Sequence, residues 1–403
     1  MNMTPEYRFK KADGSNFPEW KRRKIGDIYT ERNERGNDAL PILSVSIHSG
    51  VSGDEMDEEE LGKRVNRSED KSLYKRVSPG DLVFNMMRAW QGAIGTVKTE
   101  GMVSPAYITA KPSDEVYPPF MDFFMRTDEM IHIINRQSYG VTDFRKRLYW
   151  DSFANIECFI PSIEEQKKIA DFLYTLEVLT EEKEKEIEDT IQYKVGIMRA
   201  IFQQERRFKK DDGSDFPEWK YCKLGDVLTE YNEKASKGKN YEHVSLTKEG
   251  VVPKTERYDR DFLVTQDDKK YRVTHYDDIC YNPANLKFGV ICRNKYGDAI
   301  FSPIYVTFKV NEGFLPAYVE AFLVRWDFIA TTLKYQQGTV YERMAVSSKD
   351  LLSMDIAVPC MDEQKKIADF LTLLDEKIEN QQSIFKALVK MKKGYEQKLL
   401  LSK

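Results

Sequence analysis

The segment "EEQKKIADFL" at 164–173 returns as "DEQKKIADFL" at 362–371 in a chain of 403 residues. A longer pair of copies supports this repeat, because "RFKKADGSNFPEWKRRKIGDIYTERNE" (8–34) and "RFKKDDGSDFPEWKYCKLGDVLTEYNE" (207–233) are identical at 19 of 27 positions. Between these anchors "VSPAYIT" (103–109) matches "FSPIYVT" (301–307), and Gly140 and Arg145 match Gly338 and Arg343. The chain is therefore an internal duplication, and each half is expected to form the same structure.

Each half consists of a variable globular unit followed by one long helix. Short β-rich runs such as "DLVFNM" and "DDICYN" alternate with Gly, Pro and Asn turns and a helical stretch, so we expect two tandem-repeat α+β domains. The predicted boundaries are 1–160 for the first domain, 161–205 for the central helix, 206–358 for the second domain and 359–403 for the C-terminal helix.

The two long helices are predicted from their starts and from their periodicity. Pro161 precedes Ser162 as N-cap, and Glu165 follows three residues later, as in a capping box. Apolar residues then recur at steps of three and four, which is typical of a coiled-coil seam. They are Ile169, Phe172, Leu176, Leu179, Ile187, Ile191, Met198 and Ile201 in the central helix, and Ile367, Phe370, Leu374, Ile378, Ile384, Leu388, Met391 and Tyr395 in the last.

The charges of the two helices favour pairing with each other. The segment 161–205 holds 11 acidic and 6 basic residues, whereas 359–403 holds 7 acidic and 9 basic residues. Two equivalent helices on two equivalent domains pair most simply as an antiparallel coiled coil with pseudo-two-fold symmetry. The alternative is that each helix packs back on its own domain as a brace.

Composition excludes several classes of protein. No run of about 18 apolar residues is present, and the N-terminal residues lack the apolar stretch of a signal peptide, so we expect a cytoplasmic protein. The five cysteines form no CxxC pair and the four histidines lie far apart, which supports neither a disulfide framework nor a zinc site. No phosphate-binding or dinucleotide-binding glycine motif occurs. The segment "NPAN" (282–285) lacks the aromatic residue of an amino-methyltransferase motif, so it is interpreted as a turn.

In these features the chain resembles the specificity subunit of type I restriction-modification systems over essentially its whole length. The resemblance rests on "PSIEEQKKIADFL" (161–173) and "PCMDEQKKIADFL" (359–371), on the paired "FPEWK" segments, on "SPAY" and "SPIY", and on the order of domains and helices. The resemblance implies a DNA-binding protein that has no catalytic activity of its own and takes part in defence against foreign DNA. Each variable unit would be a target recognition domain for one half of a bipartite, asymmetric site, and the helices would set the gap.

The resemblance also implies the partners. Two methyltransferase subunits would dock on the helices and carry S-adenosylmethionine for DNA adenine methylation, and restriction subunits would add an ATP- and magnesium-dependent motor and nuclease. No cofactor and no metal are expected on this chain, and double-stranded DNA is the expected ligand. Its net charge of −4 and pI near 5.9 give no global attraction to a polyanion. Partner subunits would therefore contribute much of the phosphate contact.

Candidate DNA contacts are Arg, Lys, Asn, Gln and Thr residues in the expected loops, because such side chains bind base edges and phosphates. In the first domain they are Lys63, Arg64, Arg67, Arg88, Gln91, Arg145, Lys146 and Arg147, with Trp90 either beside them or in the core. In the second domain they are Lys269, Lys270, Arg272, Asn285, Lys287, Gln336, Gln337, Thr339 and Arg343. Each of these residues is alternatively an ordinary solvated surface residue.

Residues expected to pack the helices or to dock a partner are Ile169, Phe172, Leu176, Ile367, Phe370 and Leu374. The junction 201–220 is highly charged, and we expect it to be exposed, as a hinge or a recombination seam. Two other functions remain open at this point. One is a helical scaffold that binds only proteins, which predicts no affinity for duplex DNA. The other is a stand-alone DNA methyltransferase, which predicts binding of S-adenosylmethionine by the isolated chain.

Overall fold

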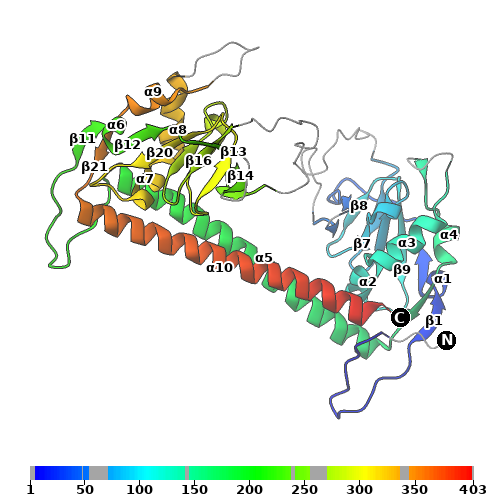
Figure 1. The fold of residues 1–403 in the computed structure, drawn as a ribbon. Helices are drawn as coiled ribbons and strands as arrows, with labels where there is room; N and C mark the ends of the chain where they lie inside the picture. Colours follow the sequence, from blue (N-terminus) through cyan, green and yellow to red (C-terminus); the bar gives the residue numbers. More distant parts are fainter. Residues whose placement is uncertain are drawn as a thin grey trace. The chain divides into compact units, whose positions relative to one another are not determined.

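The computed structural model describes residues 5–47, 49–53, 71–140, 145–236, 241–254, 270–335 and 345–401. It divides into two compact units: unit 1 comprises 1–184 with 383–403, and unit 2 comprises 185–382. Each unit contains one α+β domain and parts of both long helices, α5 (Ile163–Phe202) and α10 (Met361–Leu400) (Figure 1). The helices begin within two residues of the predicted boundaries at 161 and 359. None of the helices in the described ranges has the length and hydropathy needed to span a lipid bilayer.

The domain of unit 1 is built on a four-stranded antiparallel sheet in the order β2-β9-β6-β7. Two-stranded pairs β1-β10, β3-β4 and β5-β8 surround it. Its elements are β1 (Lys21–Lys24), α1 (Ile25–Ile28), β2 (Tyr29–Glu31), β3 (Val45–Ser46), β4 (Gly50–Val51), β5 (Lys75–Val77), β6 (Leu82–Asn85), η1 (Ala89–Gln91), β7 (Ile94–Thr96), β8 (Gly101–Val103), β9 (Tyr107–Pro112), α2 (Pro118–Met125), α3 (Asp128–Gln137), α4 (Trp150–Ala154) and β10 (Glu157–Ile160).

The domain of unit 2 repeats this plan with a four-stranded sheet β12-β20-β17-β18 and a pair β11-β21, and adds a five-stranded sheet β13-β16-β19-β14-β15. Its elements are β11 (Lys220–Lys223), α6 (Leu224–Val227), β12 (Leu228–Tyr231), β13 (Lys234–Ser236), β14 (Glu242–Leu246), β15 (Val251–Pro253), β16 (Lys270–Thr274), β17 (Ile279–Tyr281), η5 (Leu286–Phe288), β18 (Ile291–Arg293), β19 (Ala299–Phe301), β20 (Val306–Val310), α7 (Pro316–Leu323), α8 (Trp326–Thr332), η6 (Leu333–Tyr335), α9 (Ser348–Leu352) and β21 (Asp355–Val358).

The central strand of the sheet in unit 1 is buried on both faces, because its side chains alternate between two hydrophobic clusters. Leu82 and Phe84 of β6 belong to the main core, which includes α2 and the first turns of α5. Val83 points to the other face and joins a smaller cluster with Leu43 and Val103. The sheet is thus held against the start of the long helix on one side and covered by the outer strands on the other.

The repeated glutamate of the quoted segment anchors each helix to its own domain. In unit 1 the fully buried Glu165 accepts hydrogen bonds from Arg8 Nε and Nη2 at 3.0 and 2.8 Å. In unit 2 the fully buried Glu363 accepts equivalent bonds from Arg207 at 3.1 and 2.9 Å. Trp219 Nε1 adds a third bond to Glu363 at 3.1 Å. A buried carboxylate requires such partners, so this contact fixes where the helix begins.

The repeated glutamine anchors the helix to the loop before the domain's own helices. Gln166 accepts from Tyr117 N at 2.8 Å and donates to the carbonyl oxygens of Glu115 and Pro161 at 2.8 and 3.0 Å. Gln364 makes the same set of bonds, accepting from Leu315 N at 3.0 Å and donating to the carbonyl oxygens of Gly313 and Pro359. Each glutamine side chain therefore supplies hydrogen-bond partners to backbone groups of the loop that would otherwise lack them.

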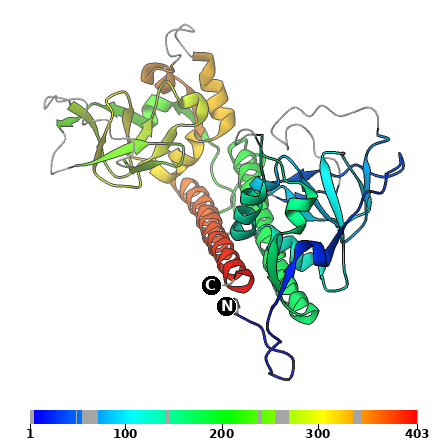
Figure 2. The ribbon, with the colours of Figure 1, turned by 90° about the vertical axis from the view of Figure 1, so that its right-hand side faces the viewer.

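The segment before each domain also packs on the long helix. The ring of Phe9 lies 5.6 Å from that of Phe172, and the ring of Phe208 lies 5.6 Å from that of Phe370. The expectation that the junction 201–220 is simply exposed is therefore wrong for Arg207 and Phe208, which bind α10. At the other end of unit 1, Tyr7 N donates to Lys398 O at 3.0 Å, so the N-terminal segment runs beside the end of α10 (Figure 2).

The predicted capping box at the start of α5 is wrong. Ser162 Oγ is buried and has no hydrogen-bond partner in the part of the chain that the structure describes. Glu165 turns toward Arg8 instead of toward the start of the helix, because a guanidinium satisfies both of its oxygens.

Parts of α5 and α10 pair in antiparallel fashion within each unit. In unit 1 the start of α5 meets the end of α10, with Phe172 and Tyr395 rings 4.9 Å apart and Lys392 Nζ 2.9 Å from Glu177 Oε1. In unit 2 the roles of the helices are exchanged, and Lys194 pairs with Asp375. The two ion pairs occupy repeat-equivalent positions, as the predicted pseudo-two-fold pairing requires. The brace alternative is also present in part, since each helix start packs on its own domain.

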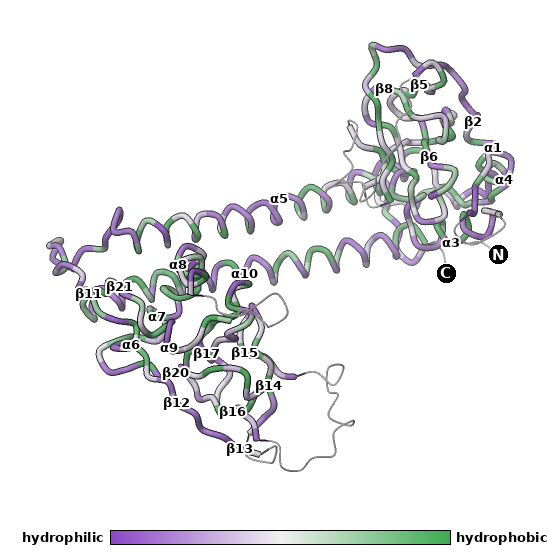
Figure 3. Tube along the Cα trace, turned by 90° about the horizontal axis from the view of Figure 1, so that it is seen from above, coloured by the Kyte–Doolittle hydropathy of each residue, from purple (hydrophilic) through white to green (hydrophobic). Residues whose placement is uncertain are grey.

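Several residues predicted for the seam lie outside it. Leu179, Ile191, Ile384 and Met391 are exposed, whereas Thr190 and Gln381 are buried. Gln381 Nε2 donates across the helix pair to Glu186 Oε1 at 2.7 Å. The hydropathy of both helices alternates along their length in Figure 3. A buried polar residue in such a seam stabilises one register of the helices over others.

We predict that Arg207→Ala lowers the free energy of unfolding by about 3 kcal/mol, because Glu363 would stay buried without its guanidinium. Urea denaturation measures this. The matched control is Arg22→Ala, which breaks the solvent-exposed pair of Arg22 with Glu157 and should cost at most about 1 kcal/mol. Equal losses in the two variants would contradict the anchoring role.

Candidate nucleic-acid interface

The same turn follows the central strand in both units. After β6, Asn85 Oδ1 accepts from Met87 N at 2.9 Å, and after β17, Asn282 Oδ1 accepts from Ala284 N at 3.1 Å. A 3₁₀ turn comes next, η1 or η5, and Gly92 or Gly289 ends it with a positive φ of 103° or 80°. Each buried Asn closes the turn, and only glycine adopts the last conformation without strain. The interpretation of "NPAN" as a turn is confirmed.

This turn places Arg88 and Gln91 on the surface of unit 1. Arg88 Nε donates to Gln91 Oε1 at 3.1 Å, so the two side chains lie together on the exposed side of η1. Trp90 is half-buried against the main core, and its Nε1 donates to Met87 O at 3.0 Å. The tryptophan therefore positions the turn, while Arg88 and Gln91 remain able to bind a ligand.

The second predicted basic group of unit 1 lies beside this turn. Leu148 N donates to Met86 O at 2.9 Å, which joins the two segments, and Lys146 Nζ lies 5.9 Å from the centre of the Trp90 ring. Lys146 also donates to Asn135 Oδ1 at 3.3 Å. The structure thus brings together residues that are more than 50 positions apart in the sequence.

Gly140 allows two segments of backbone to pass close to each other, its own and that of Arg145. A Cβ at Gly140 would lie 2.3 Å from Arg145 O, which is too close for any other residue. Tyr139 and Arg147 exchange backbone hydrogen bonds of 3.1 and 2.9 Å at the base. Arg145 and Arg147 are exposed on this loop. The repeated Gly of the sequence therefore has a structural basis in unit 1, whereas Gly338 and Arg343 lie outside the described residues.

Unit 2 carries different side chains on the equivalent turn. Asn285 is exposed, and Lys287 Nζ lies 5.0 Å from the centre of the Phe288 ring. Lys248 Nζ approaches the same ring at 6.0 Å. Phe288 is 53% exposed, so this part of unit 2 presents an aromatic ring between two cations.

Sequence reasoning missed four exposed apolar residues next to these polar groups. They are Met87, Tyr139, Tyr149 and Phe288. The rings of Tyr139 and Tyr149 lie 5.3 Å apart beside the Arg145 loop. The adjacency of "RKR" and "LYW" in the sequence is the pattern that indicates such a site, since aromatic rings stack on bases and on arginine.

The remaining candidates fall into two groups. Eight lie outside the described residues: Lys63, Arg64, Arg67, Lys269, Gln336, Gln337, Thr339 and Arg343. The other two lie on β16, where Lys270 is exposed. Arg272 is buried, donates to Tyr231 O at 2.8 Å and lies 3.8 Å from Glu230. Its guanidinium is used inside the domain, so we do not include Arg272 in the interface.

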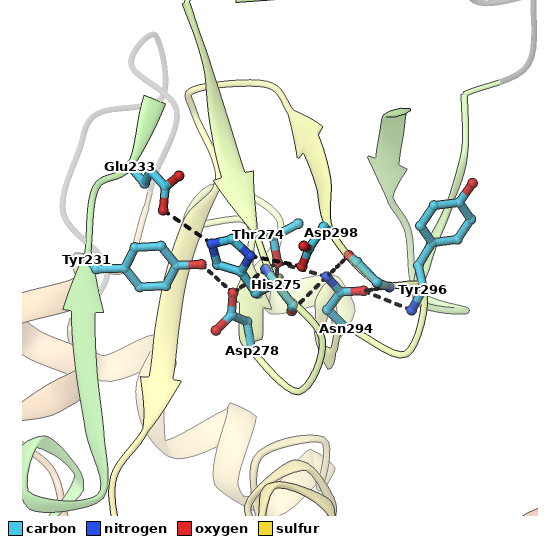
Figure 4. Close-up of polar contacts among 10 residues, drawn as sticks. Tyr231, Glu233, Thr274, His275, Asp278, Asn294, Tyr296 and Asp298 are labelled. Carbon is cyan, nitrogen blue, oxygen red and sulfur yellow. Dashed lines mark hydrogen bonds and ion pairs between the residues drawn. The ribbon is translucent and has the colours of Figure 1, made fainter. Parts of the chain in front are cut away.

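A network of polar and charged side chains lies at the end of β16, around His275 (Figure 4). His275 lies between two carboxylates, with Nδ1 2.9 Å from Asp298 Oδ1 and Nε2 3.2 Å from Glu233 Oε2. Burial lowers the pKa of His275, but the hydrogen bonds that its ring donates to the Asp298 and Glu233 carboxylates outweigh this effect, so the net shift is upward. Tyr231 OH donates to Asp278, whose pKa is raised by burial.

Unit 1 stabilises the equivalent position with a permanent charge. Arg32 Nη1 lies 2.8 Å from Asp81 Oδ2, and Arg32 Nη2 lies 2.7 Å from Glu34 Oε2. Asp81 and Asp278 are repeat-equivalent, as are Glu34 and Glu233. The two carboxylates are kept in both units, but their partners differ. Arg32 contacts both of them in unit 1, whereas in unit 2 Glu233 lies beside the titratable His275 ring and Asp278 accepts from Tyr231 OH and from His275 N.

Five of the six predicted helix-packing residues belong to or pack on the hydrophobic cores of their units, and the sixth, Leu176, is buried. Ile169, Leu176 and Ile367 are buried, and Phe172, Phe370 and Leu374 are partly buried. They therefore hold the helices in place rather than face a partner. The exposed apolar residues of the helices include two repeat-equivalent pairs, Ile191 with Val389 and Tyr193 with Met391.

No family model matches the chain. Over 99% of its length it is 24% identical to the "Putative type I restriction enzyme MjaX specificity subunit" of Methanocaldococcus jannaschii, 97% of which is covered. It is 23% identical to the type I restriction enzyme MjaVIII specificity subunit of the same organism, over 62% of this chain and 58% of that protein.

Two solved structures share the fold. One is the type I restriction-modification S subunit from M. genitalium, with a TM-score of 0.55, 13% identity and coverage of 98% and 99% of the two chains. The other comes from work on complex assembly and conformational transition of a type I restriction-modification system, with a TM-score of 0.55, 14% identity and coverage of 96% and 99%. The predicted resemblance and the predicted α+β fold class are confirmed.

We predict that unit 2 loses thermal stability as the pH rises from 6 to 8. The pKa of His275 is raised in the folded state, so its contribution is fully present below the unfolded pKa of about 6.5 and is lost as the pH rises through the folded pKa. Calorimetry at several pH values should show this slope, and His275→Gln should flatten it. The control His132→Gln, at an exposed site on α3, should keep it, and an unchanged slope in His275→Gln would contradict the assignment.

Proposed function

We propose that this chain is the DNA sequence-specificity subunit of a type I restriction-modification complex, a subunit that performs no chemistry and directs that of its partners. The overall similarity to specificity subunits over nearly all of both chains supports this function. Two copies of one domain, each anchored to a long helix, suit the recognition of a DNA site that has two halves.

The turn after the central strand, residues 85–92 in unit 1 and 282–289 in unit 2, is proposed as the recognition turn, and it has the same backbone in both units but different side chains. The buried Asn and the terminal Gly are kept at 85 and 92 and at 282 and 289. Between them the half-exposed Arg88 of unit 1 corresponds to the exposed Asn285 of unit 2. Arginine binds guanine bidentately and asparagine binds adenine, so the two turns are suited to different bases.

The surrounding groups supply contacts that do not depend on sequence. Arg145, Lys146 and Arg147 lie beside the turn of unit 1, and Lys248 and Lys287 lie beside that of unit 2. Such residues bind phosphates and fix the register of a protein on the duplex. Because the chain has a net charge of −4, basic partner subunits add to this attraction.

Two methyltransferase subunits dock on the exposed apolar residues of the helices. The repeat-equivalent pairs Ile191 with Val389 and Tyr193 with Met391 provide two similar surfaces, as two identical partners require. Motor and nuclease subunits complete the complex. S-adenosylmethionine, ATP and magnesium belong to these partners rather than to this chain.

The test of the function is the methylome of a host that carries the intact system. With the chain present, one bipartite motif should be methylated on adenine, and deletion of the chain should abolish that methylation. Persistence of the same motif without the chain would contradict the proposal. A chain that binds methyltransferase subunits but not duplex DNA would favour a protein scaffold instead.

We predict that Arg88→Ala with Gln91→Ala relaxes recognition of one half-site and leaves the other half-site intact. Loss of a bidentate contact should cost about 1 to 3 kcal/mol, or roughly fivefold to 150-fold in affinity for the preferred base. Methylome sequencing identifies the affected half-site. The matched variant Asn285→Ala in unit 2 should relax the opposite half-site, and relaxation of the same half-site by both variants would contradict one unit per half-site.

The helices are expected to set the gap between the half-sites. Four residues inserted into both helices at equivalent places, after Glu184 and after Gln382, add about 6 Å at 1.5 Å per residue, which is close to two base pairs. We expect the methylated motif to gain one or two base pairs in its gap, with both half-sites unchanged and affinity reduced. The control inserts the four residues in α5 alone, which should weaken helix pairing because the Lys194–Asp375 and Glu177–Lys392 pairs can then no longer form together. An unchanged gap with full activity would contradict the spacer role.

A further inference from the structure

The recognition turn of unit 2 carries an exposed aromatic ring that the fold does not require. Phe288 is 53% exposed, whereas Leu286 of the same turn is fully buried and supplies its apolar contact with the core. The equivalent position in unit 1 holds the polar Gln91, which is also exposed. A polar residue therefore fits this position, and packing within the domain does not explain the phenylalanine.

The geometry of the turn places Phe288 beside Asn285. Residues three apart in a 3₁₀ turn lie on the same face, and Phe288 N donates to Asn285 O at 3.0 Å. Side chains at the same interval meet in unit 1, where Arg88 Nε donates to Gln91 Oε1 at 3.1 Å. Asn285, which is proposed to bind adenine, and Phe288 therefore present their side chains to neighbouring parts of one ligand.

Two lysines from different segments lie near the ring of Phe288. Lys287 Nζ is 5.0 Å from the centre of the ring, and Lys248 Nζ, from the loop between β14 and β15, is 6.0 Å from it. An apolar group beside positive charges is complementary to a polyanion that has apolar groups between its phosphates. Duplex DNA has this character, because its phosphates flank the base edges in each groove.

The chemistry of a phenyl ring restricts what it can recognise on DNA. The ring forms no conventional hydrogen bond, so it does not distinguish the donors and acceptors of the bases. The apolar group that base pairs present in the major groove is the 5-methyl of thymine, which phenylalanine can contact. Asparagine binds N6 and N7 of adenine in the same groove. Asn285 and Phe288 together therefore suit an adenine and a thymine that are adjacent in the major groove.

We propose that Phe288 is a specificity-determining residue, which recognises the 5-methyl group of a thymine next to the adenine bound by Asn285. The inference deepens the proposed function and rests on it. Gln91 at the equivalent position of unit 1 forms hydrogen bonds instead. Dependence on a thymine methyl group at this position is therefore a property of unit 2 and of its half-site.

The test measures, by fluorescence anisotropy, the binding of synthetic duplexes to the complex of the full-length chain with its methyltransferase subunits. The half-site of unit 2 is first identified with the Asn285→Ala variant. Each thymine of that half-site, on either strand, is then replaced by deoxyuridine, which removes the methyl group and keeps the base pair. One replacement should weaken binding about fourfold, as expected for the loss of one buried methyl group.

Variants of Phe288 connect this discrimination to the ring. Phe288→Gln introduces the residue of unit 1, and it should bind the thymine and deoxyuridine duplexes equally. Phe288→Leu keeps an apolar contact and should retain part of the discrimination. The matched control is Tyr276→Gln, which removes another exposed ring of unit 2 and should leave the discrimination unchanged. Deoxyuridine in the half-site of unit 1 should have the same effect with and without Phe288→Gln.

The proposal is overturned if no deoxyuridine in the half-site of unit 2 weakens binding, or if the discrimination survives in Phe288→Gln. An equal loss of affinity for both duplexes in Phe288→Gln would show that the ring inserts between base pairs, which also overturns it. In these cases the proposed function stands, because the complex still binds a bipartite site. Failure of the wild-type complex to bind any duplex sequence-specifically would overturn both.

Discussion

The buried carboxylate at the start of each long helix is the contact on which the rest of the architecture depends. Glu165 and Glu363 are fully buried, and a buried carboxylate is stable only when charged donors satisfy it. Arg8 and Arg207 supply those donors from segments that lie about 156 residues earlier in the chain. The contact joins the segment before a domain to the helix after it, so each domain is closed on itself at its own helix. This is why two distant stretches of sequence are repeated together.

Because this buried contact closes each domain at its own helix, the recognition turn does not depend on it. The turn is held from within its sheet, by Asn85 or Asn282 and by a terminal glycine, and its exposed side chains contribute little to the core. Arg88 can therefore correspond to Asn285 without any change at Glu165 or Glu363. The side chains of the turn proposed to contact DNA can therefore change at low cost in stability, because other residues hold the fold.

The repeat, the two long helices and the turn at 282–285 follow from the sequence, because each depends on local pattern or on direct comparison of the two halves. The partner of a charged side chain does not. Arg272 has the sequence environment of a surface residue, yet it is buried against Tyr231, and Glu165 has the spacing of a capping box, yet it binds Arg8. These choices depend on which strands and segments become neighbours in space. The exposed ring of Phe288 is equally hidden in the sequence, since apolar residues are usually interior.

Where the two halves differ, the difference itself is informative, because the shared fold holds everything else constant. Arg32 in unit 1 and His275 in unit 2 lie beside equivalent carboxylates, so one unit has a permanent charge where the other has a titratable one. Thr96 and Arg293 also occupy equivalent positions, and the arginine forms ion pairs with Glu320 and Asp277. Neither difference touches the buried anchors. A duplicated chain can therefore keep one means of assembly while its two domains acquire different surfaces, which is what recognition of an asymmetric site by an otherwise symmetric pair of domains requires.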